Sequence, residues 1–253
     1  MGWRRGLSTV GAGLCSLRAA SMNPLAFALD FPDVKAARPV VRAVAAEIGM
    51  LKVGLELFLA GGASAVKLGL EVDLPVFLDL KLHDIPETVD RAVARAASLG
   101  AKMLTVHASG GPAMLERAVA RAAAEATGLQ IVAVTVLTSL DESDLVATGV
   151  VRDPAAHALG LATMAKQAGV DAFVCSPKEA RSLRDALGPD VVLITPGVRA
   201  KSADAGDQKR VASAGDAIRA GATWVVVGRP IRDAADPVLA ARAIADEIRE
   251  ASA

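Results

Sequence analysis

The sequence lacks several features that would mark particular classes of protein. It has 2 cysteines, Cys15 and Cys175, which lie far apart and form no CxxC pair. This spacing argues against a disulfide framework, fits a reducing cytoplasm and leaves Cys175 as a small buried residue. Lys plus Arg number 28, as do Asp plus Glu, so no charge excess suggests nucleic acid or an acidic membrane surface as a partner. No apolar run approaches the roughly 20 residues of a membrane span.

Motifs for cofactors and metals are also missing. No GxGxxG or P-loop string occurs, so a nucleotide cofactor has no evident site. No set of His, Asp and Glu has the spacing of metal ligands, and we predict no metal. His83, beside Asp84, is interpreted as a structural hydrogen-bonding residue, and His107 as a histidine whose hydrogen bonds are satisfied at the rim or in the core.

Residues 1–21 stand apart from the rest of the chain. They contain Arg4, Arg5 and Arg18, several Gly and Ser, and no acidic residue. A transit or export segment is one interpretation, but its apolar part is short and is interrupted by glycine. We favour a start codon upstream of the true one at Met22, or a disordered extension. One domain is therefore expected over residues 22–253.

From Pro24 onward, short apolar runs alternate with Ala-rich amphipathic segments. Strands are expected at residues 25–31, 50–54, 75–81, 103–108, 131–138, 172–176, 191–198 and 224–231. Helices are expected near residues 33–47, 56–68, 86–99, 112–126, 154–168, 178–187, 209–220 and 236–251. This alternation predicts the α/β class, and eight repeats in 253 residues favour a single (β/α)8 TIM barrel over an open sheet. Gly100, Gly169 and Gly221 are expected to cap helices at their C-termini.

In such a barrel the chemistry lies at the carboxyl ends of the strands. Polar residues fall at or near these ends along the chain: Asp30, Lys52, Asp79, Lys81, His107, Thr138, Ser139, Pro196, Arg199, Gly228 and Arg229. This distribution predicts one functional rim.

The densest charge follows the third expected strand. Strand periodicity puts Asp79 and Lys81 on one face, and Asp84 falls just past the strand, so the three groups could converge on one pocket. A lysine held between two carboxylates stays protonated and becomes a positioned proton donor. The alternative is a solvated turn with a surface ion pair.

Lys52 is a charge in an otherwise apolar strand, where an unpaired ammonium would be costly. Asp79 on the neighbouring strand is the obvious partner, which gives a row of alternating charge through Lys52, Asp79, Lys81 and Asp84. Alternatively, Lys52 extends along the strand and places its ammonium at the rim.

A second cluster follows the seventh and eighth expected strands, where barrels commonly bind phosphate. It comprises TPGVR at 195–199, a loop to Gln208, and the Gly228-Arg229 pair. Gly228 would let the backbone approach a ligand closely, and the Arg229 guanidinium can bind two oxygens at once. Residues 201–207 are predicted to form a mobile lid. The alternative is a surface loop with incidental arginines.

The string DLKLHDIPET, from Asp79 to Thr88, resembles the active-site segment of type 1 orotidine 5′-phosphate decarboxylases. The resemblance continues through ALDF ending at Phe31, KVG from Lys52, VTVLTS ending at Ser139, TPGVR, GDQKR from Gly206 and VVVGRPI ending at Ile231. It implies cofactor-free decarboxylation of orotidine 5′-phosphate to uridine 5′-phosphate, the last step of de novo UMP biosynthesis. It also implies a homodimer in which Asp84 reaches the active site of the partner subunit.

The same resemblance assigns roles to individual residues. The catalytic set would be Lys81, Asp79, Asp84 and Lys52, with Lys81 as the proton donor to C6 of the pyrimidine. Asp30 would hydrogen-bond the ribose, and Thr138 and Ser139 would address the pyrimidine. The remaining substrate-binding residues would be Lys52, Asp79, Thr88, Pro196, Arg199, Gln208, Gly228 and Arg229, the last four of them on the phosphate side.

Two alternatives remain open at this point. The first is a 3-keto-L-gulonate 6-phosphate decarboxylase or hexulose-phosphate synthase, which shares the barrel and a similar Asp-x-Lys-x-x-Asp motif but uses Mg2+. Those enzymes typically carry an acidic residue where this chain has Lys52, and they lack the TPGVR and DQKR strings. The second is a catalytically silent nucleotide-binding protein, against which the intact Asp79, Lys81 and Asp84 argue.

Overall fold

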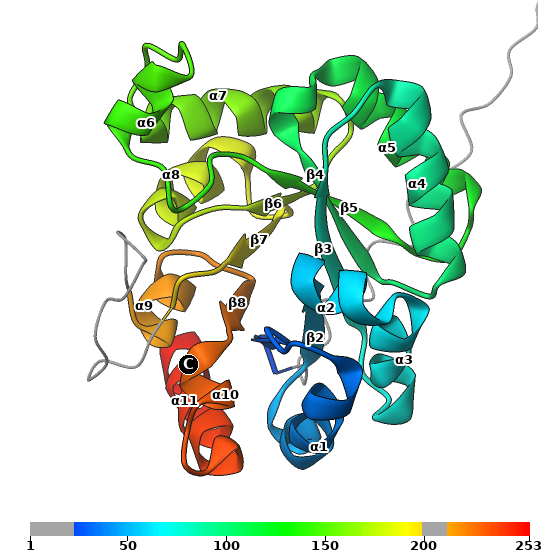
Figure 1. The fold of residues 1–253 in the computed structure, drawn as a ribbon. Helices are drawn as coiled ribbons and strands as arrows, with labels where there is room; N and C mark the ends of the chain where they lie inside the picture. The colour runs from blue at the N-terminus through cyan, green and yellow to red at the C-terminus, as the bar shows by residue number, and fades with distance from the viewer. Residues whose placement is uncertain (1–22, 199–211) are drawn as a thin grey trace, which may run out of the picture.

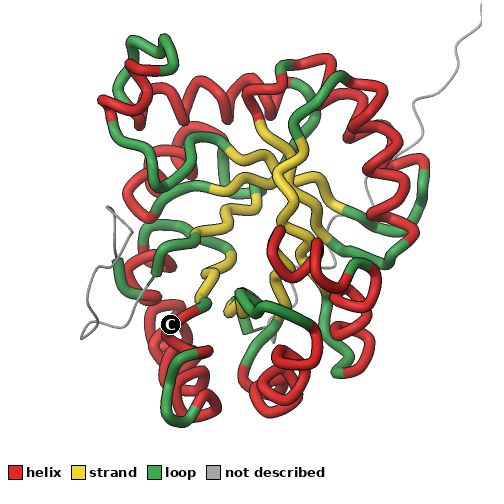
Figure 2. The backbone as a smooth tube through the Cα atoms, viewed as in Figure 1, coloured by secondary structure: helices red, strands yellow, loops and turns green. Residues whose placement is uncertain are grey.

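The computed structural model describes residues 23–198 and 212–253, and these residues form a closed barrel of parallel strands in chain order from β1 to β8. β8 pairs with β1 to close the sheet. Figures 1 and 2 show the strands in the middle of the molecule, with the helices around them. The expected (β/α)8 TIM barrel is confirmed.

The strands are β1 (Leu25–Ala28), β2 (Met50–Gly54), β3 (Val76–Leu82), β4 (Met103–His107), β5 (Gln130–Val134), β6 (Ala172–Val174), β7 (Val192–Thr195) and β8 (Trp224–Val227). The helices are α1 (Val34–Val44), α2 (Leu55–Gly61), α3 (Ala63–Glu71), α4 (Pro86–Ser98), α5 (Pro112–Ala124), α6 (Glu142–Ala147), α7 (Pro154–Gln167), α8 (Pro177–Leu187), α9 (Ala214–Arg219), α10 (Arg229–Arg232) and α11 (Pro237–Ser252). Two 3-10 turns are η1 (Ala45–Glu47) and η2 (Ala108–Gly110).

The core has two layers, one inside the barrel and one between the strands and the helices. Along β1, Ala26 and Ala28 pack into the interior with Phe77. Leu25 and Phe27 belong to the outer layer, which also contains helix residues such as Val41. Because successive strand residues point to opposite faces, a strand buried on both faces needs the continuous apolar runs that the sequence shows.

Several element boundaries differ from the expected ones. The expected strand at 224–231 ends at Val227, and α10 follows at once because Pro230 has no N–H to donate to a sheet and suits the first turn of a helix. The expected helix at 56–68 is divided into α2 and α3 at Gly62, whose φ of 50° and ψ of −130° are not helical. β1 and β5 end earlier than expected, so Asp30 and Thr138 lie beyond their strands.

α6 lies in a segment for which no helix was expected. The carboxylate of Asp141 accepts the Asp144 N–H, and the carboxylate of Asp144 accepts the Asp141 N–H. This reciprocal capping satisfies N–H groups that a short helix would otherwise leave unpaired. The expected C-cap glycines are confirmed, since Gly100, Gly169 and Gly221 have φ values of 82°, 91° and 105°.

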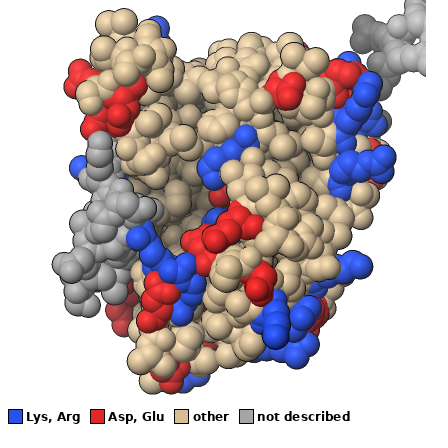
Figure 3. All heavy atoms as spheres, viewed as in Figure 1, with Lys and Arg blue, Asp and Glu red and all other residues tan. Residues whose placement is uncertain are grey.

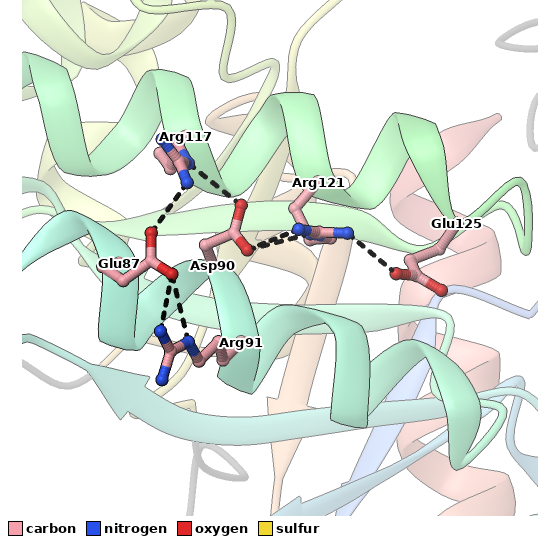
Figure 4. A network of polar contacts seen from close by, with 6 residues as sticks. All are labelled: Glu87, Asp90, Arg91, Arg117, Arg121 and Glu125. Atoms are coloured by element: carbon pink, nitrogen blue, oxygen red, sulfur yellow. Dashed lines mark hydrogen bonds and ion pairs between the residues drawn. The ribbon is translucent and has the colours of Figure 1, made fainter.

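An ion-pair network joins α4 to α5 (Figure 4). Asp90, which is buried, accepts hydrogen bonds from Arg117 Nε at 3.1 Å and from Arg121 Nη2 at 2.7 Å. Hydrogen bonds from Arg121, followed by those from Arg117, outweigh burial and lower the pKa of Asp90 below its ordinary value. Glu87 accepts from Arg117 at 2.8 Å and extends the network along α4.

Within residues 23–198 and 212–253, no helix combines the length and apolar character that crossing a membrane requires.

Candidate active site

A cavity of about 230 Å³ lies at the carboxyl ends of the strands. Its apolar wall includes Phe77, Val134 and Ile194, which are buried side chains of the barrel interior and its upper edge. The polar side chains that line it are Asp30, Lys52, Asp79, Lys81, Thr138 and Arg229. In Figure 3 the surface is hollowed near the middle of the view, with acidic and basic atoms along the edge of the hollow. Residues far apart in the sequence therefore meet at one rim.

β2, β3 and the segment that follows β1 supply a row of alternating charge. Lys81 Nζ lies 2.8 Å from Asp79 Oδ1, and Lys52 Nζ lies 3.4 Å from Asp79 Oδ2. Lys52 Nζ also lies 3.8 Å from Asp30 Oδ1. Lys52 is therefore paired with carboxylates. Its side chain is only 13% exposed, so the ammonium does not extend into solvent at the rim.

Asp79 is at the centre of this row. Burial by itself raises the pKa of Asp79, but the charges of Lys52 and Lys81, and hydrogen bonds from Lys81 and Thr105, outweigh that effect. The pKa of Asp79 therefore lies below its ordinary value, and the carboxylate is ionised at neutral pH.

Thr105, a residue that the sequence analysis missed, supports the row from β4. Its hydroxyl accepts a hydrogen bond from the Lys81 N–H at 2.7 Å and donates one to Asp79 Oδ1 at 3.0 Å. The side chain is fully buried. The sequence does mark Thr105, as a polar residue in the apolar run of a strand that is buried on both faces. A buried hydroxyl needs hydrogen-bond partners, so such a residue points to a buried polar contact.

The opposite end of the cavity is formed after β7 and β8. Pro196, Gly228 and Arg229 line it, and Gly228 lies close to Asp30, whose Oδ2 would be 2.8 Å from a Cβ added at the glycine. Arg232, on α10, donates through Nη1 to the backbone carbonyl of Asp30 at 2.6 Å. α10 is thereby joined to the segment that follows β1. Arg232 was not among the site residues predicted from the sequence.

Other expected site residues lie elsewhere. Arg199, Gln208 and the expected lid at 201–207 are outside the described residues. Asp84 is exposed, and its Oδ1 accepts the Ile85 N–H at 2.6 Å. Thr88 and Ser139 are exposed and do not belong to the cavity lining. The expected convergence of Asp84 with Asp79 and Lys81 in one pocket of a single chain is therefore not seen, because the turn after β3 leads Asp84 away.

The two rim histidines lie against each other. The rings of His83 and His107 have centroids 5.5 Å apart. Burial, followed by the charges of His83 and Lys81, lowers the pKa of His107 below its ordinary value. In the described ranges no group of three or more His, Cys, Asp and Glu comes together as metal ligands would.

Cys175 is fully buried, as expected, and burial raises the pKa of its thiol to about 12.

Comparisons with known proteins place the chain among characterised sequences and folds. The family model described as "Orotidine 5'-phosphate decarboxylase / HUMPS family" matches residues 23–244. An orotidine 5′-phosphate decarboxylase of Anaeromyxobacter sp. (strain K) is 54% identical over 218 residues, which cover 86% of this chain and 95% of that protein. The orotidine 5′-phosphate decarboxylase of Moorella thermoacetica is 46% identical over 238 residues, covering 92% and 94%. A crystal structure of orotidine 5′-phosphate decarboxylase from Lactobacillus acidophilus has a TM-score of 0.77 at 33% identity, covering 89% of this chain and 98% of that one.

Proposed function

The chain belongs to the orotidine 5′-phosphate decarboxylase family and converts orotidine 5′-phosphate to uridine 5′-phosphate in pyrimidine biosynthesis, and we propose that Lys81 is the proton donor. The observation that carries this proposal is the pairing of Lys81 Nζ with Asp79 Oδ1 at 2.8 Å in the wall of the barrel-mouth cavity. Both side chains are mostly buried, and Asp79 is ionised. Lys81 is thus a charged ammonium at a fixed position facing a cavity.

The reaction needs such a group for a definite reason. When the bond from C6 to the carboxyl carbon breaks, its electron pair stays on C6 in the plane of the pyrimidine, where the ring π system cannot delocalise it directly. An ammonium placed beforehand beside C6 stabilises that charge electrostatically. Lys81 then transfers a proton to C6, a C–H bond forms, CO2 leaves, and the neutral amine regains its proton from solvent.

Lys52 and Asp79 hold the Lys81 ammonium in position for this step. Asp79 orients the Lys81 ammonium, and Lys52 balances the carboxylate from its other oxygen at 3.4 Å. The two carboxylate oxygens of Asp79 thus each face an ammonium group, so the negative charge of Asp79 near a bound carboxylate or carbanion is compensated. This arrangement supports electrostatic stabilisation by residues of the chain itself, with no cofactor assigned to the step.

The far end of the cavity is proposed to bind the phosphate. Gly228 exposes backbone at the lining, and the Arg229 guanidinium can bind two phosphate oxygens. Arg199 and Gln208 are proposed for the same end, and Asp30 and Thr138 for the ribose and the pyrimidine, because these positions match the family motifs. Binding energy from a phosphate far from C6 can be used to stabilise the transition state.

We also propose that the enzyme is a homodimer with composite active sites. Asp84 is exposed and so is its neighbour Ile85, whose exposed fraction is 65%. Leu59, on α2, is 82% exposed. A second hollow, of about 200 Å³, is lined by Lys52, Asp79 and Lys81 and by the start of α2. An Asp84 side chain from a partner subunit, entering there, would complete the row of alternating charge.

Mixing two variants tests the composite site. Lys81→Ala and Asp84→Ala should each be inactive alone. In a mixed dimer one site carries both substitutions and the other carries neither, so random pairing should restore about a quarter of the parent activity. Verified mixed dimers without restored activity would mean that Asp84 acts within its own chain or not at all.

A direct absorbance assay with orotidine 5′-phosphate tests the function as a whole. Turnover in the presence of EDTA is expected to equal turnover with added Mg2+. A requirement for Mg2+, together with activity on a 3-keto sugar phosphate, would instead favour the gulonate-phosphate decarboxylase branch. Tight binding of uridine 5′-phosphate without any turnover would indicate a silent nucleotide-binding protein.

We place the enzyme in the cytoplasm. The bacterial origin of the relatives and the buried, unpaired thiol of Cys175 support this location. Fractionation of the source cells, with activity followed in the cytoplasmic and membrane fractions, tests the proposal. Recovery of the activity mainly with membranes would contradict it.

A further inference from the structure

The strand that carries the reacting groups is irregular where they lie. Leu78 of β3 pairs with Leu104 of β4, whereas Leu82 pairs with Val106. Residues 79–81 therefore stand opposite Thr105 alone. Such bulges redirect side chains and leave backbone groups without their regular sheet partners. The register shift occurs at Asp79 and Lys81 themselves.

Lys81 has a backbone conformation that side chains disfavour. Its φ is 51°, in the left-handed region that glycine occupies readily. Residues with a Cβ rarely adopt this conformation, apart from asparagine and aspartate. A conformation of this kind persists only where the surroundings hold it in place, and it is frequent at functional sites. The structure must therefore contain a contact that stabilises the bulge at Lys81.

Thr105 provides that contact. A backbone N–H can only donate and an ionised carboxylate can only accept, so the Thr105 hydroxyl must accept from the Lys81 N–H and give its single proton to Asp79 Oδ1. Asp79 Oδ1 also accepts from Lys81 Nζ at 2.8 Å. One hydroxyl thus closes a ring that links the backbone of Lys81, the carboxylate of Asp79 and the Lys81 ammonium.

We propose that Thr105 is a positioning residue for the decarboxylation, whose hydroxyl fixes the Lys81 backbone in its left-handed bulge and aims Asp79 Oδ1 at the Lys81 ammonium. This inference rests on the proposed role of Lys81 as proton donor. Thr105 contacts the row from β4 and is not part of the cavity lining.

The consequences for catalysis are specific. Without the hydroxyl, Lys81 loses the partner of its N–H and Asp79 loses one donor, so the ammonium moves relative to C6. Misplacement by about 1 Å can lower a rate by about 100-fold. The phosphate end of the cavity is untouched, so binding of the nucleotide should change little.

The acid limb of the pH profile should also move. Among the described residues, the charged or titratable groups facing Asp79 are Lys52 from β2, Lys81 from β3 and His107 from β4. Burial raises the pKa of Asp79 and these lysines lower it, with the Thr105 hydrogen bond as a further lowering contribution. Removing that hydrogen bond raises the pKa of Asp79, so activity should begin to fall at a higher pH.

Thr105→Val is the first test, because valine keeps the buried shape and removes only the hydroxyl. We expect kcat to fall about 10- to 100-fold while the Kd for uridine 5′-phosphate stays within about threefold. The acid limb of kcat should shift to higher pH. Thr105→Ser should restore both the rate and the pH profile of the parent.

Two controls make the test decisive. Thr135→Val removes another buried hydroxyl, which among the described residues donates to the Val174 carbonyl alone, at 3.1 Å. This variant should leave kcat and its pH profile unchanged. If Thr105→Val does not fold, Thr105→Ser and Thr105→Ala replace it, since they differ only in the hydroxyl.

A Thr105→Val enzyme with the parent kcat and pH profile would overturn the positioning role, and so would equal losses in the valine and serine variants, or in the serine and alanine variants. Each of these three results leaves the proposed function intact. A parent enzyme that does not decarboxylate orotidine 5′-phosphate would instead contradict the function itself.

Discussion

Replacing Lys81 with alanine should abolish decarboxylation and leave nucleotide binding measurable. General acid catalysis contributes about 10²- to 10⁴-fold, and a preorganised electrostatic donor about 10²- to 10³-fold. If Lys81 supplies both, kcat should fall by about 10⁴- to 10⁷-fold, or about 5 to 10 kcal/mol of transition-state stabilisation. Alanine and lysine both disfavour the positive φ of this position to a similar degree, so the substitution does not change the cost of the backbone conformation.

The fold should survive this change because Asp79 keeps a counter-ion. At an effective dielectric of about 20, the pair at 2.8 Å has a gross Coulomb attraction of about 6 kcal/mol, and the Lys52 pair at 3.4 Å about 5 kcal/mol. Nearly half of the attraction therefore remains, although desolvation cancels much of either figure. Asp79 should stay ionised and the cavity should keep its shape.

The assay combines single-turnover absorbance with calorimetric binding of uridine 5′-phosphate. Lys81→Arg is the matched variant, because arginine keeps the positive charge but does not release its proton. It should recover part of the electrostatic contribution and none of the proton transfer. A Lys81→Ala enzyme within tenfold of the parent kcat would refute the role of Lys81. Loss of nucleotide binding in that variant would refute the reasoning about Asp79.

The remaining predictions concern the phosphate end of the cavity and the stability of the barrel. Arg229→Ala should weaken binding of uridine 5′-phosphate about 10- to 100-fold, as expected for a lost charge-assisted hydrogen bond, and leave binding of uridine unchanged; equal affinity of variant and parent for the phosphorylated ligand would reject this role. Gly228→Ala places a Cβ 2.8 Å from Asp30 Oδ2, so the carboxylate must move relative to Lys52 and KM should rise several-fold, whereas an unchanged KM would show that the contact is relieved without cost. Asp90→Asn should lower the melting temperature at pH 7. The pKa of Asp90 is lowered in the folded state, so the ionised carboxylate stabilises the fold above the unfolded pKa of about 4. This stabilisation is lost as pH falls through the folded pKa. The difference in melting temperature between parent and variant should therefore shrink toward pH 3. A difference independent of pH would contradict the ion-pair account.

The sequence predicted the barrel well because its signals are repeated and local. Apolar runs buried on both faces alternate with amphipathic segments, and glycines such as Gly169 mark helix ends. The failures occurred where one residue could suit two elements. Pro230 follows an apolar strand in the sequence but belongs to α10. Asp141 caps a helix in a segment for which no helix was expected.

The part of the site that follows strand periodicity was predictable from the residues themselves. Lys52 and Asp79 lie on neighbouring strands and meet as expected. The left-handed φ of Lys81 depends on a register shift between β3 and β4, which no property of either strand alone reveals. Thr105 is a polar residue in an apolar strand, which marks it as a buried hydrogen-bonding group, but its contact with the Lys81 N–H depends on that register shift. Asp84 was expected beside Lys81 from its spacing, but the turn between them decides the direction of its side chain.

Deuterium exchange at C6 of uridine 5′-phosphate tests the central claim most directly. If Lys81 delivers the proton to C6, microscopic reversibility requires that its amine can also remove that proton. In D2O the parent enzyme should therefore catalyse loss of the C6 proton resonance, and Lys81→Ala, saturated with the same nucleotide, should show no exchange above the uncatalysed rate. Equal exchange by both enzymes would contradict the assignment of Lys81 as the proton donor.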